Sequence, residues 1–183
     1  GAQSVGMVGD WCESHPAARD LFRRAADILG YDLAAICASG PAAKLNTTAV
    51  SQPAILVTSL AALEVLKSRD PAPLERATLT AGLSLGEYTA LVFAGALDFD
   101  DAVRLVDVRG RAMQECAEMR PGAMVAVLGL DRAAVAKLCD ESRGADVLEV
   151  ANVLCPGNVV ASGSADACRR LEAAATAAGA MKC

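Results

Sequence analysis

The stretch that decides the fold reads ATLTAGLSLGEY and covers residues 77–88. Its first part, residues 77–81, is a run of small and β-branched residues that predicts a buried strand, whereas residues 87–94 predict a helix. Between them residues 82–86, GLSLG, match the G-x-S-x-G pattern, in which a serine occupies a strained corner between a strand and a helix. The glycines on either side are too small to block a substrate. The sequence therefore predicts a nucleophile elbow with Ser84 as the nucleophile.

The helix after this corner should stabilise negative charge beside the serine. The first N–H groups of a helix have no acceptor within the helix, and the helix dipole is positive at that end. We therefore expect the backbone N–H of Leu85 to donate to the oxyanion that forms when Ser84 attacks a carbonyl. This arrangement favours acyl chemistry on the serine.

The same region has some features of a membrane helix. Residues 77–97 carry a single charge, Glu87, and Gly82 and Gly86 have the G-x-x-x-G spacing of packed membrane helices. A third glycine, Gly95, and a charge in the middle of the span favour a turn and a packed core helix instead.

A helix is predicted from Asp98 to Met119, because Asp98 is a good N-cap and acidic residues follow in the first turn. Arg109 lies within its apolar stripe. A buried charge without a partner costs several kcal/mol, so Arg109 either pairs with an internal carboxylate, extends to solvent, or binds an anionic substrate. The apolar stripe consists of Ala102, Leu105, Val106, Met113 and Cys116, and the polar stripe of Asp100, Arg104, Asp107, Arg111, Glu115 and Glu118.

The remaining pattern alternates helices and strands, which predicts an α/β fold. Helices are expected over Pro16–Leu29 and Gln52–Ser68, and a boundary falls at Pro121-Gly122, which gives two subdomains, residues 1–120 and 121–183. The order in the second subdomain is β-α-β-β-α-β, which predicts a ferredoxin-like unit. Its elements are strand 123–129, helix 131–142, strands 147–152 and 158–162, helix 164–178 and a last strand that begins near Met181.

Composition narrows the class of protein. The 183 residues are 54% hydrophobic, which is ample material for a core, and the net charge is −5. Without a basic cluster or an aromatic platform, nucleic acid is excluded as a partner. The seven cysteines are widely spaced and form no C-x-x-C pair, so we expect small core or surface residues in a reducing compartment rather than disulfides or metal ligands.

Five segments together resemble the malonyl-CoA:acyl-carrier-protein transacylase family, in the family's order. Leu83 stands where most relatives have His, which points to a branch of the family that includes plastid-type and some bacterial members. The segments are GAQSVGM at 1–7, SQPAI at 51–55, GLSLGEYTAL at 82–91, VRGRAMQ at 108–114 and NVLCPGNVVASG at 152–163.

The resemblance implies a fold and an activity. The fold is an α/β-hydrolase-like large subdomain with an inserted ferredoxin-like small subdomain, and the active site lies in the cleft between them. Ser84 would take malonyl from CoA as an ester and pass it to the phosphopantetheine thiol of an acyl carrier protein in fatty acid biosynthesis. The CoA thioester is a substrate, so no cofactor and no metal are expected. Arg109 matches the arginine that binds the free carboxylate of the malonyl group.

Two further residues, Gln52 and Asn152, are carried over from the resemblance, and Met113 is considered from its position. Gln52 matches a glutamine near the cleft, although it could simply open its helix. Asn152 matches an asparagine that faces the active site, whereas Leu154 replaces an asparagine of many relatives. Met113, one turn after Arg109, either lines the acyl pocket or packs in the core.

The resemblance also implies a catalytic histidine, and its position cannot be matched here. The single histidine is His15, directly before Pro16, where a solvated or capping role is expected. We therefore expect the chain to be truncated at both ends relative to the family and to lack the catalytic histidine.

Malonyl-CoA and an acyl carrier protein are the expected partners, with no membrane. The expected location is the bacterial cytoplasm, or the interior of a plastid or mitochondrion. Three alternatives stay open: an acyltransferase domain of a polyketide synthase, a serine thioesterase or hydrolase with the same elbow, and a non-catalytic fragment that binds a carrier protein.

Overall fold

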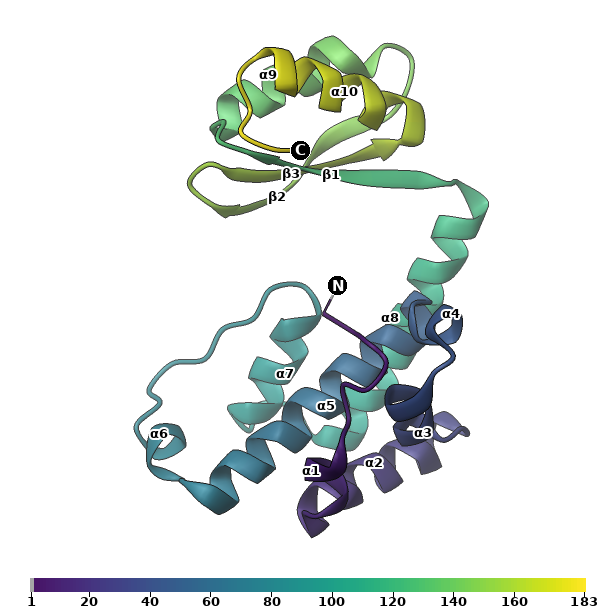
Figure 1. Ribbon diagram of the computed structural model, residues 1–183, viewed down its shortest axis with the longest axis vertical. Helices are drawn as coiled ribbons and strands as arrows, with labels where there is room; N and C mark the ends of the chain where they lie inside the picture. Colours follow the sequence, from purple (N-terminus) through teal and green to yellow (C-terminus); the bar gives the residue numbers. More distant parts are fainter. Residues whose placement is uncertain (1) are drawn as a thin grey trace. The chain divides into compact units, whose positions relative to one another are not determined.

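The computed structural model describes residues 2–183, which combine helices with one sheet, as the predicted α/β class requires. The chain divides into two compact units, Gly1–Glu115 and Cys116–Cys183. The boundary between them lies inside helix α8 (Phe99–Met119), and Figure 1 labels the elements of each unit.

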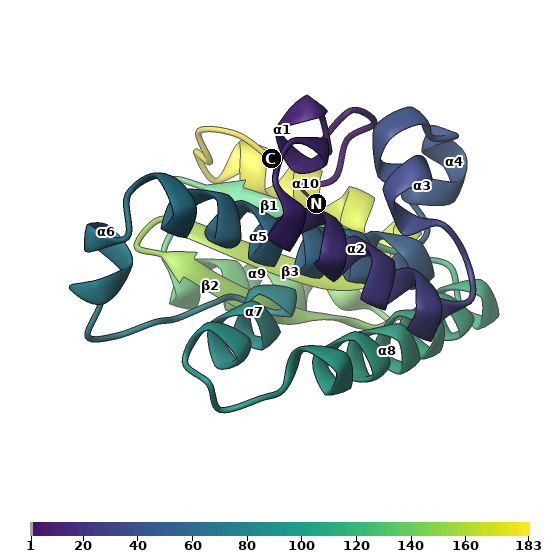
Figure 2. The ribbon, with the colours of Figure 1, turned by 90° about the horizontal axis from the view of Figure 1, so that it is seen from below.

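The described part of the first unit is helical. Its central helix is α5, and α2 lies along it (Figures 1 and 2). The helix predicted over Pro16–Leu29 is confirmed as α2, with Gly30 in the left-handed conformation at its end. The helices before α8 are α1 (Asp10–Glu13), α2 (Pro16–Leu29), α3 (Leu33–Ser39), α4 (Ala42–Leu45), α5 (Thr48–Arg69), α6 (Ala72–Glu75) and α7 (Leu85–Phe93).

Helix α5 begins one turn before the predicted start at Gln52. The backbone N–H of Thr48, which has no acceptor within the helix, donates to the side chain of Gln114 at 3.0 Å. A partner 66 residues away in the chain fixes this helix start. That is why local sequence signals did not reveal it.

The α5 helix forms much of the core of the first unit. It is the one helix in residues 2–183 that is long and apolar enough to cross a membrane, but 56% of its most apolar window is buried against the other helices. It is therefore best described as a core helix. Its most deeply buried residues include Ala54, Leu56, Val57 and Ala61, which belong to one core cluster with Ala18, Phe22, Ala25 and Leu33.

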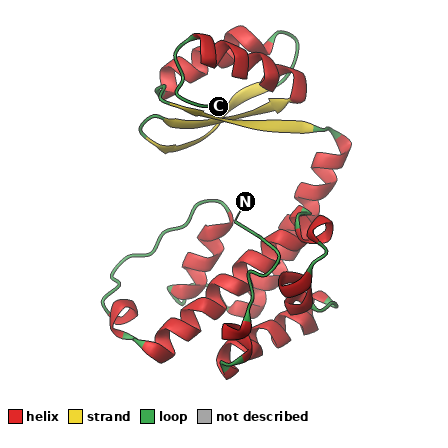
Figure 3. Ribbon diagram, in the orientation of Figure 1, coloured by secondary structure: helices red, strands yellow, loops and turns green. Residues whose placement is uncertain are grey.

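The strand predicted over residues 77–81 is wrong. Figure 3 shows this segment as part of the loop between α6 and α7, and all five residues are exposed. A strand needs a neighbour to accept and donate its backbone hydrogen bonds, and residues 2–115 contain no strand. The helix after the corner is confirmed as α7.

Helix α8 confirms the prediction for residues 98–119, but its buried face differs from the expected stripe. The Leu105 side chain is 49% exposed, and Met113 and Cys116 are exposed too. Arg109 consequently borders the buried face and does not lie at its centre. The buried residues of α8 are Phe99, Ala102, Val103, Val106 and Gly110.

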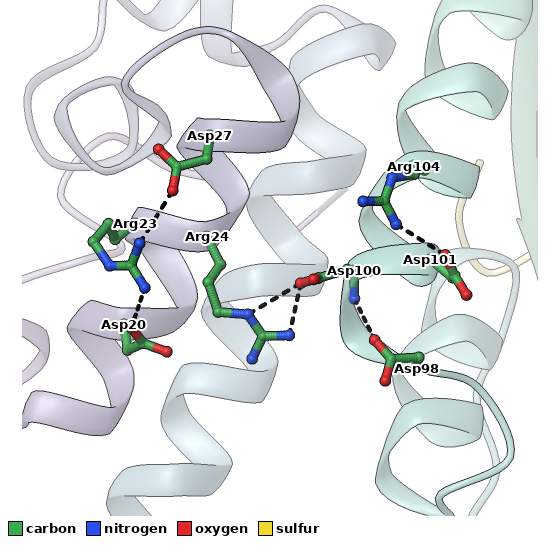
Figure 4. A network of polar contacts seen from close by, with 8 residues as sticks. All are labelled: Asp20, Arg23, Arg24, Asp27, Asp98, Asp100, Asp101 and Arg104. Atoms are coloured by element: carbon green, nitrogen blue, oxygen red, sulfur yellow. Dashed lines mark hydrogen bonds and ion pairs between the residues drawn. The ribbon is translucent and has the colours of Figure 1, made fainter.

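An ion pair joins the start of α8 to α2 (Figure 4). Arg24 donates from Nε and Nη2 to Asp100 Oδ1 at 3.0 and 2.6 Å, and its guanidinium lies 4.7 Å from the centre of the Phe99 ring. Asp98 Oδ1 accepts from the Asp100 N–H at 3.0 Å, as expected of an N-cap. The other pairs in Figure 4, such as Arg104 with Asp101, are exposed and contribute little to stability.

The second unit is a three-stranded antiparallel sheet with the order β1-β3-β2 and two helices on one face (Figures 1 and 2). Val127 pairs with Val159 in register, and both are buried under the helices. The predicted sequence of strands and helices is confirmed through α10. The elements are β1 (Gly122–Leu128), α9 (Arg132–Arg143), β2 (Leu148–Cys155), β3 (Asn158–Ser164) and α10 (Ala165–Ala177).

The last predicted strand, near Met181, is present only as an isolated bridge. Leu128 accepts from the Met181 N–H at 2.7 Å and donates to the Lys182 carbonyl at 2.9 Å. The turn after α10 extends to Ala180, so no longer ladder forms within the described residues.

The burial of the cysteines makes the fold testable by thiol labelling. All seven are free thiols, and burial raises the pKa of Cys37 to about 11. Alkylation needs the thiolate, and a raised pKa reduces the thiolate fraction at a mildly alkaline pH. With iodoacetamide we expect Cys116 and Cys155 to be modified first and Cys37 last, as measured by peptide mass spectrometry. All seven should react at similar rates in denaturant. Native Cys37 reacting as fast as Cys116 would contradict this core.

Candidate active site

Ser84 occupies the strained corner that the sequence predicts. Its backbone has φ 48° and ψ −109°, and it is the one non-glycine residue with positive φ in residues 2–183. Such a conformation costs about 1–3 kcal/mol and persists only where the surrounding structure enforces it. Ser84 immediately precedes α7 and is exposed. The loop and helix together present its hydroxyl to solvent.

The two glycines of the motif have different functions. A Cβ atom at Gly82 would lie 2.0 Å from both the carbonyl carbon and the oxygen of Gly86, so only glycine fits there. A Cβ atom at Gly86 would meet nothing within 4 Å. Gly82 thus allows the loop to cross closely over the start of α7, and Gly86 is not needed for that crossing.

The start of α7 presents a free donor beside Ser84. The Gly86 N–H donates to the Leu83 carbonyl at 2.8 Å and the Glu87 N–H to the Ser84 carbonyl at 3.3 Å. Within residues 2–183 the Leu85 N–H has no acceptor, while the Leu85 side chain is buried in the core. The sequence predicts this N–H as an oxyanion donor, and it is open to a ligand.

Arg109 reaches from α8 to the serine. Its Nη2 donates to Ser84 Oγ at 2.9 Å, its Nη1 donates to Gln52 Oε1, and its guanidinium lies 5.8 Å from the centre of the Tyr88 ring. No carboxylate in residues 2–183 forms an ion pair with it. Of the three alternatives for this cation, an internal ion pair is therefore absent from the described chain. The charge remains available to an anionic ligand.

Gln52 and Met113 complete the cluster. The Gln52 side chain is only 6% exposed, and its Nε2 donates to Met113 Sδ at 3.2 Å. Met113 is 44% exposed, so the core position considered for it is wrong. Gln52 lies in the second turn of α5 and therefore does not open the helix.

Sequence reasoning missed the residues that hold this cluster together. A Cβ atom at Gly110 would lie 2.6 Å from the Thr48 carbonyl oxygen, so α8 approaches α5 at a distance that only glycine permits. The Thr48 hydroxyl donates to the Gly110 carbonyl at 2.9 Å. A glycine inside a helix costs about 1 kcal/mol relative to alanine, and that cost could have marked Gly110 as a packing position.

Two residues considered from the sequence form no hydrogen bond with this cluster in the described chain. His15 Nδ1 lies 2.6 Å from the Trp11 carbonyl oxygen and 3.1 Å from Ser14 Oγ, and its side chain does not cap α2. His15 is thus the N-cap residue of α2 by position, as expected, but it caps through its backbone carbonyl, and the ring is half-buried. Asn152 belongs to the second unit, where it is half-buried in β2 and pairs with Val160 beside an irregularity in the register.

The chemistry of the cluster follows from its groups. A nucleophilic hydroxyl, a free N–H and a cation suit attack on the carbonyl of a substrate that carries a negative charge. Among residues 2–183 the Ser84 hydroxyl bonds to a donor, Arg109, and not to a base. Those residues also contain no group of three or more potential metal ligands.

The two glycines of the elbow give a matched pair of variants. Gly82→Ala should destabilise the first unit by about 1–3 kcal/mol, because the methyl group overlaps the backbone of α7. Gly86→Ala should cause no loss, since its methyl group enters open space in a helix. Urea unfolding measures both. Equal midpoints for the two variants would show that the close crossing at Gly82 does not exist.

Known proteins match this chain over its whole length. The acyl transferase domain family matches residues 1–183. The malonyl CoA-acyl carrier protein transacylase of Escherichia coli K12 is 45% identical over 183 residues, which cover 100% of this chain and 58% of the relative. The human mitochondrial malonyl-CoA-acyl carrier protein transacylase is 41% identical over 180 residues, or 94% of this chain and 46% of the relative.

Solved structures agree with these sequence matches. A malonyl-transacylase in complex with its type II polyketide synthase acyl-carrier protein has a TM-score of 0.90 and 40% identity, over 100% of this chain and 58% of that one. An acyl carrier protein S-malonyltransferase from Vibrio cholerae has a TM-score of 0.87 and 40% identity with the same coverage. The chain spans less than two thirds of the length of these relatives.

Proposed function

This chain belongs to the acyl transferase domain family, and we propose that it supplies the nucleophile and the substrate-binding cation of a malonyl transferase in fatty acid biosynthesis. The donor substrate would be malonyl-CoA and the acceptor an acyl carrier protein. The curated relatives with 41–45% identity described above carry this activity in their names.

Two transfers through one ester would make up the reaction. Ser84 Oγ attacks the thioester carbonyl of malonyl-CoA, the Leu85 N–H stabilises the oxyanion, and the CoA thiol leaves. The phosphopantetheine thiol of the carrier protein then attacks the malonyl ester, and Ser84 leaves as the alcohol. This is covalent catalysis with ping-pong kinetics. The thioester already carries an activated acyl group, so no cofactor is required.

Proton transfer needs a group beyond the described cluster. In the first step Ser84 loses a proton, and Arg109, its hydrogen-bond partner, is a donor that cannot accept it. The proposal therefore includes a general base that residues 2–183 do not place at Ser84. General-base assistance typically contributes about 10²–10⁴ in rate.

The proposal that the acyl group is malonyl, and not another acyl group, rests on one observation. Arg109 lies within hydrogen-bond distance of the nucleophile and has no carboxylate partner in the described chain. The malonyl group carries its free carboxylate two bonds beyond the reacting carbonyl carbon, so both can be reached from one position. The planar guanidinium can hold such a carboxylate through two parallel hydrogen bonds.

The same proposal includes the finer description of the fold. We infer an α/β-hydrolase-like large subdomain over residues 1–120 and a ferredoxin-like small subdomain over 121–183, and we keep Asn152 as a proposed substrate-binding residue. The β-α-β-β-α order and the sheet order β1-β3-β2, with Lys182 bridged to β1, support the ferredoxin-like part. We infer a location in the bacterial cytoplasm or an organelle interior, since the relatives include a protein from a bacterium and one named as mitochondrial.

A second candidate function uses the same chemistry in another pathway. The similar malonyl-transacylase that was solved with its carrier protein serves a type II polyketide synthase. A carrier protein of polyketide synthesis is therefore the alternative acceptor. Comparing transfer rates to carrier proteins of the two kinds separates these possibilities.

The Arg109→Ala variant, made in the enzyme that carries this sequence, tests the proposed function. A charge-assisted hydrogen bond contributes about 1.5–3 kcal/mol, and each 1.36 kcal/mol is a factor of about ten. We expect kcat/KM for malonyl-CoA to fall at least about tenfold, whereas the value for acetyl-CoA changes little because its methyl group makes no such bond.

Arg111→Ala is the matched control. Arg111 lies on the same helix, is exposed and pairs with Asp107 at 2.7 Å, so its removal should leave the ratio of malonyl to acetyl transfer unchanged. A folded Arg109→Ala protein that keeps the wild-type ratio would refute the assignment of malonyl.

A further inference from the structure

We propose that Gln52 is a positioning residue that determines specificity, because it holds the Arg109 guanidinium without neutralising its charge. This inference rests on the proposed function, in which Arg109 binds the carboxylate of the acyl group. In this role the buried Gln52 amide acts on the Arg109 guanidinium and does not contact the substrate.

The geometry shows both ends of the Gln52 amide in use. Oε1 accepts from Arg109 Nη1, and Nε2 donates to Met113 Sδ at 3.2 Å. An arginine only donates hydrogen bonds, so the oxygen of the amide must face Arg109 and the nitrogen must face the sulfur. Arg109 and Met113 lie four residues apart on α8. One amide from α5 therefore bridges two consecutive turns of the facing helix.

This bridge restrains a side chain whose other hydrogen-bond partner, Ser84 Oγ, is itself exposed. Arg109 is partly exposed, and an arginine side chain carries about 2 kcal/mol of rotamer entropy. Gln52, by contrast, is 6% exposed on the core helix. With Nη1 held by Gln52, Nη2 is the group that points at Ser84 Oγ, 2.9 Å away.

The backbone beneath the bridge is fixed as well. Gly110 follows Arg109 directly, and its contact with Thr48 sets the separation of α5 and α8 one turn away from Gln52. A change of amide at position 52 therefore alters the state of Arg109 with little change in the helices.

The neutrality of the amide is what makes it a determinant of specificity. A glutamate at this position would have almost the same shape and would pair with Arg109 as an internal anion. An opposite charge close by satisfies the cation, and a second carboxylate from a substrate would then meet a like charge. With a neutral acceptor, the cation keeps its charge for the ligand.

Kinetics of Gln52→Glu, in the enzyme that carries this sequence, test this idea. We expect KM for malonyl-CoA to rise and the malonyl-to-acetyl ratio of kcat/KM to fall at least about tenfold, as for loss of one charge-assisted bond. Acetyl transfer should fall much less than malonyl transfer. Loss of both activities in parallel, or an unchanged ratio, would overturn the role of the neutral amide.

Gln114→Glu is the matched control for this change. Gln114 lies on α8 and accepts from Thr48 at 3.0 and 3.1 Å, so the same exchange of amide for carboxylate occurs near the same pair of helices. The ratio should stay at the wild-type value in this variant. A fall as large as in Gln52→Glu would show that added negative charge in general, and not the bond to Arg109, sets selectivity.

Nitrogen-15 NMR of the enzyme that carries this sequence separates this inference from the proposed function. A guanidinium held by Gln52 should give distinct, slowly exchanging Nη signals for Arg109, and Gln52→Met should make them average. Unchanged Arg109 signals in Gln52→Met would overturn the positioning role. If the signals average as expected but the wild-type enzyme does not prefer malonyl over acetyl, the positioning role holds and the malonyl assignment fails.

Discussion

The close approach of α5 and α8 at Gly110 is the constraint on which the site depends. With the backbone of Gly110 against Thr48, the preceding residue on α8, Arg109, comes within hydrogen-bond distance of Gln52 on α5 and of Ser84 at the start of α7. Three helices thereby contribute one group each. Any larger side chain at position 110 would separate two of them and move the cation away from the nucleophile.

The charge of Arg109 gives the site its chemical character. A serine at a helix start is suited to acyl transfer in general, and a base elsewhere could equally direct a water molecule to the ester. What distinguishes this site is a guanidinium whose described partners are a neutral amide, a hydroxyl and an aromatic ring. In the proposed function, electrostatics select the acyl group, whereas the backbone geometry of the corner exposes the serine.

Local signals in the sequence predicted the elbow, α2 and the extent of α8, because glycines, prolines and capping residues act on their own neighbours. These local signals gave wrong predictions where contacts with residues far away in the chain determine the local structure. Residues 77–81 have the composition of a strand but no neighbour to pair with in the described chain, and α5 begins where Gln114 satisfies the Thr48 N–H. The stripe on α8 was misjudged because Leu105 and Met113 are apolar yet exposed, whereas Gly110 is buried by backbone contact.

Peptide mass spectrometry of the enzyme after brief exposure to malonyl-CoA tests the central claim most directly. We expect a malonyl group on Ser84 that resists neutral hydroxylamine, as an ester does, and that is absent from Ser84→Ala. Malonyl groups found only on exposed thiols such as Cys116 and Cys155, and removed by hydroxylamine as thioesters, would contradict it. So would an equal adduct in Ser84→Ala.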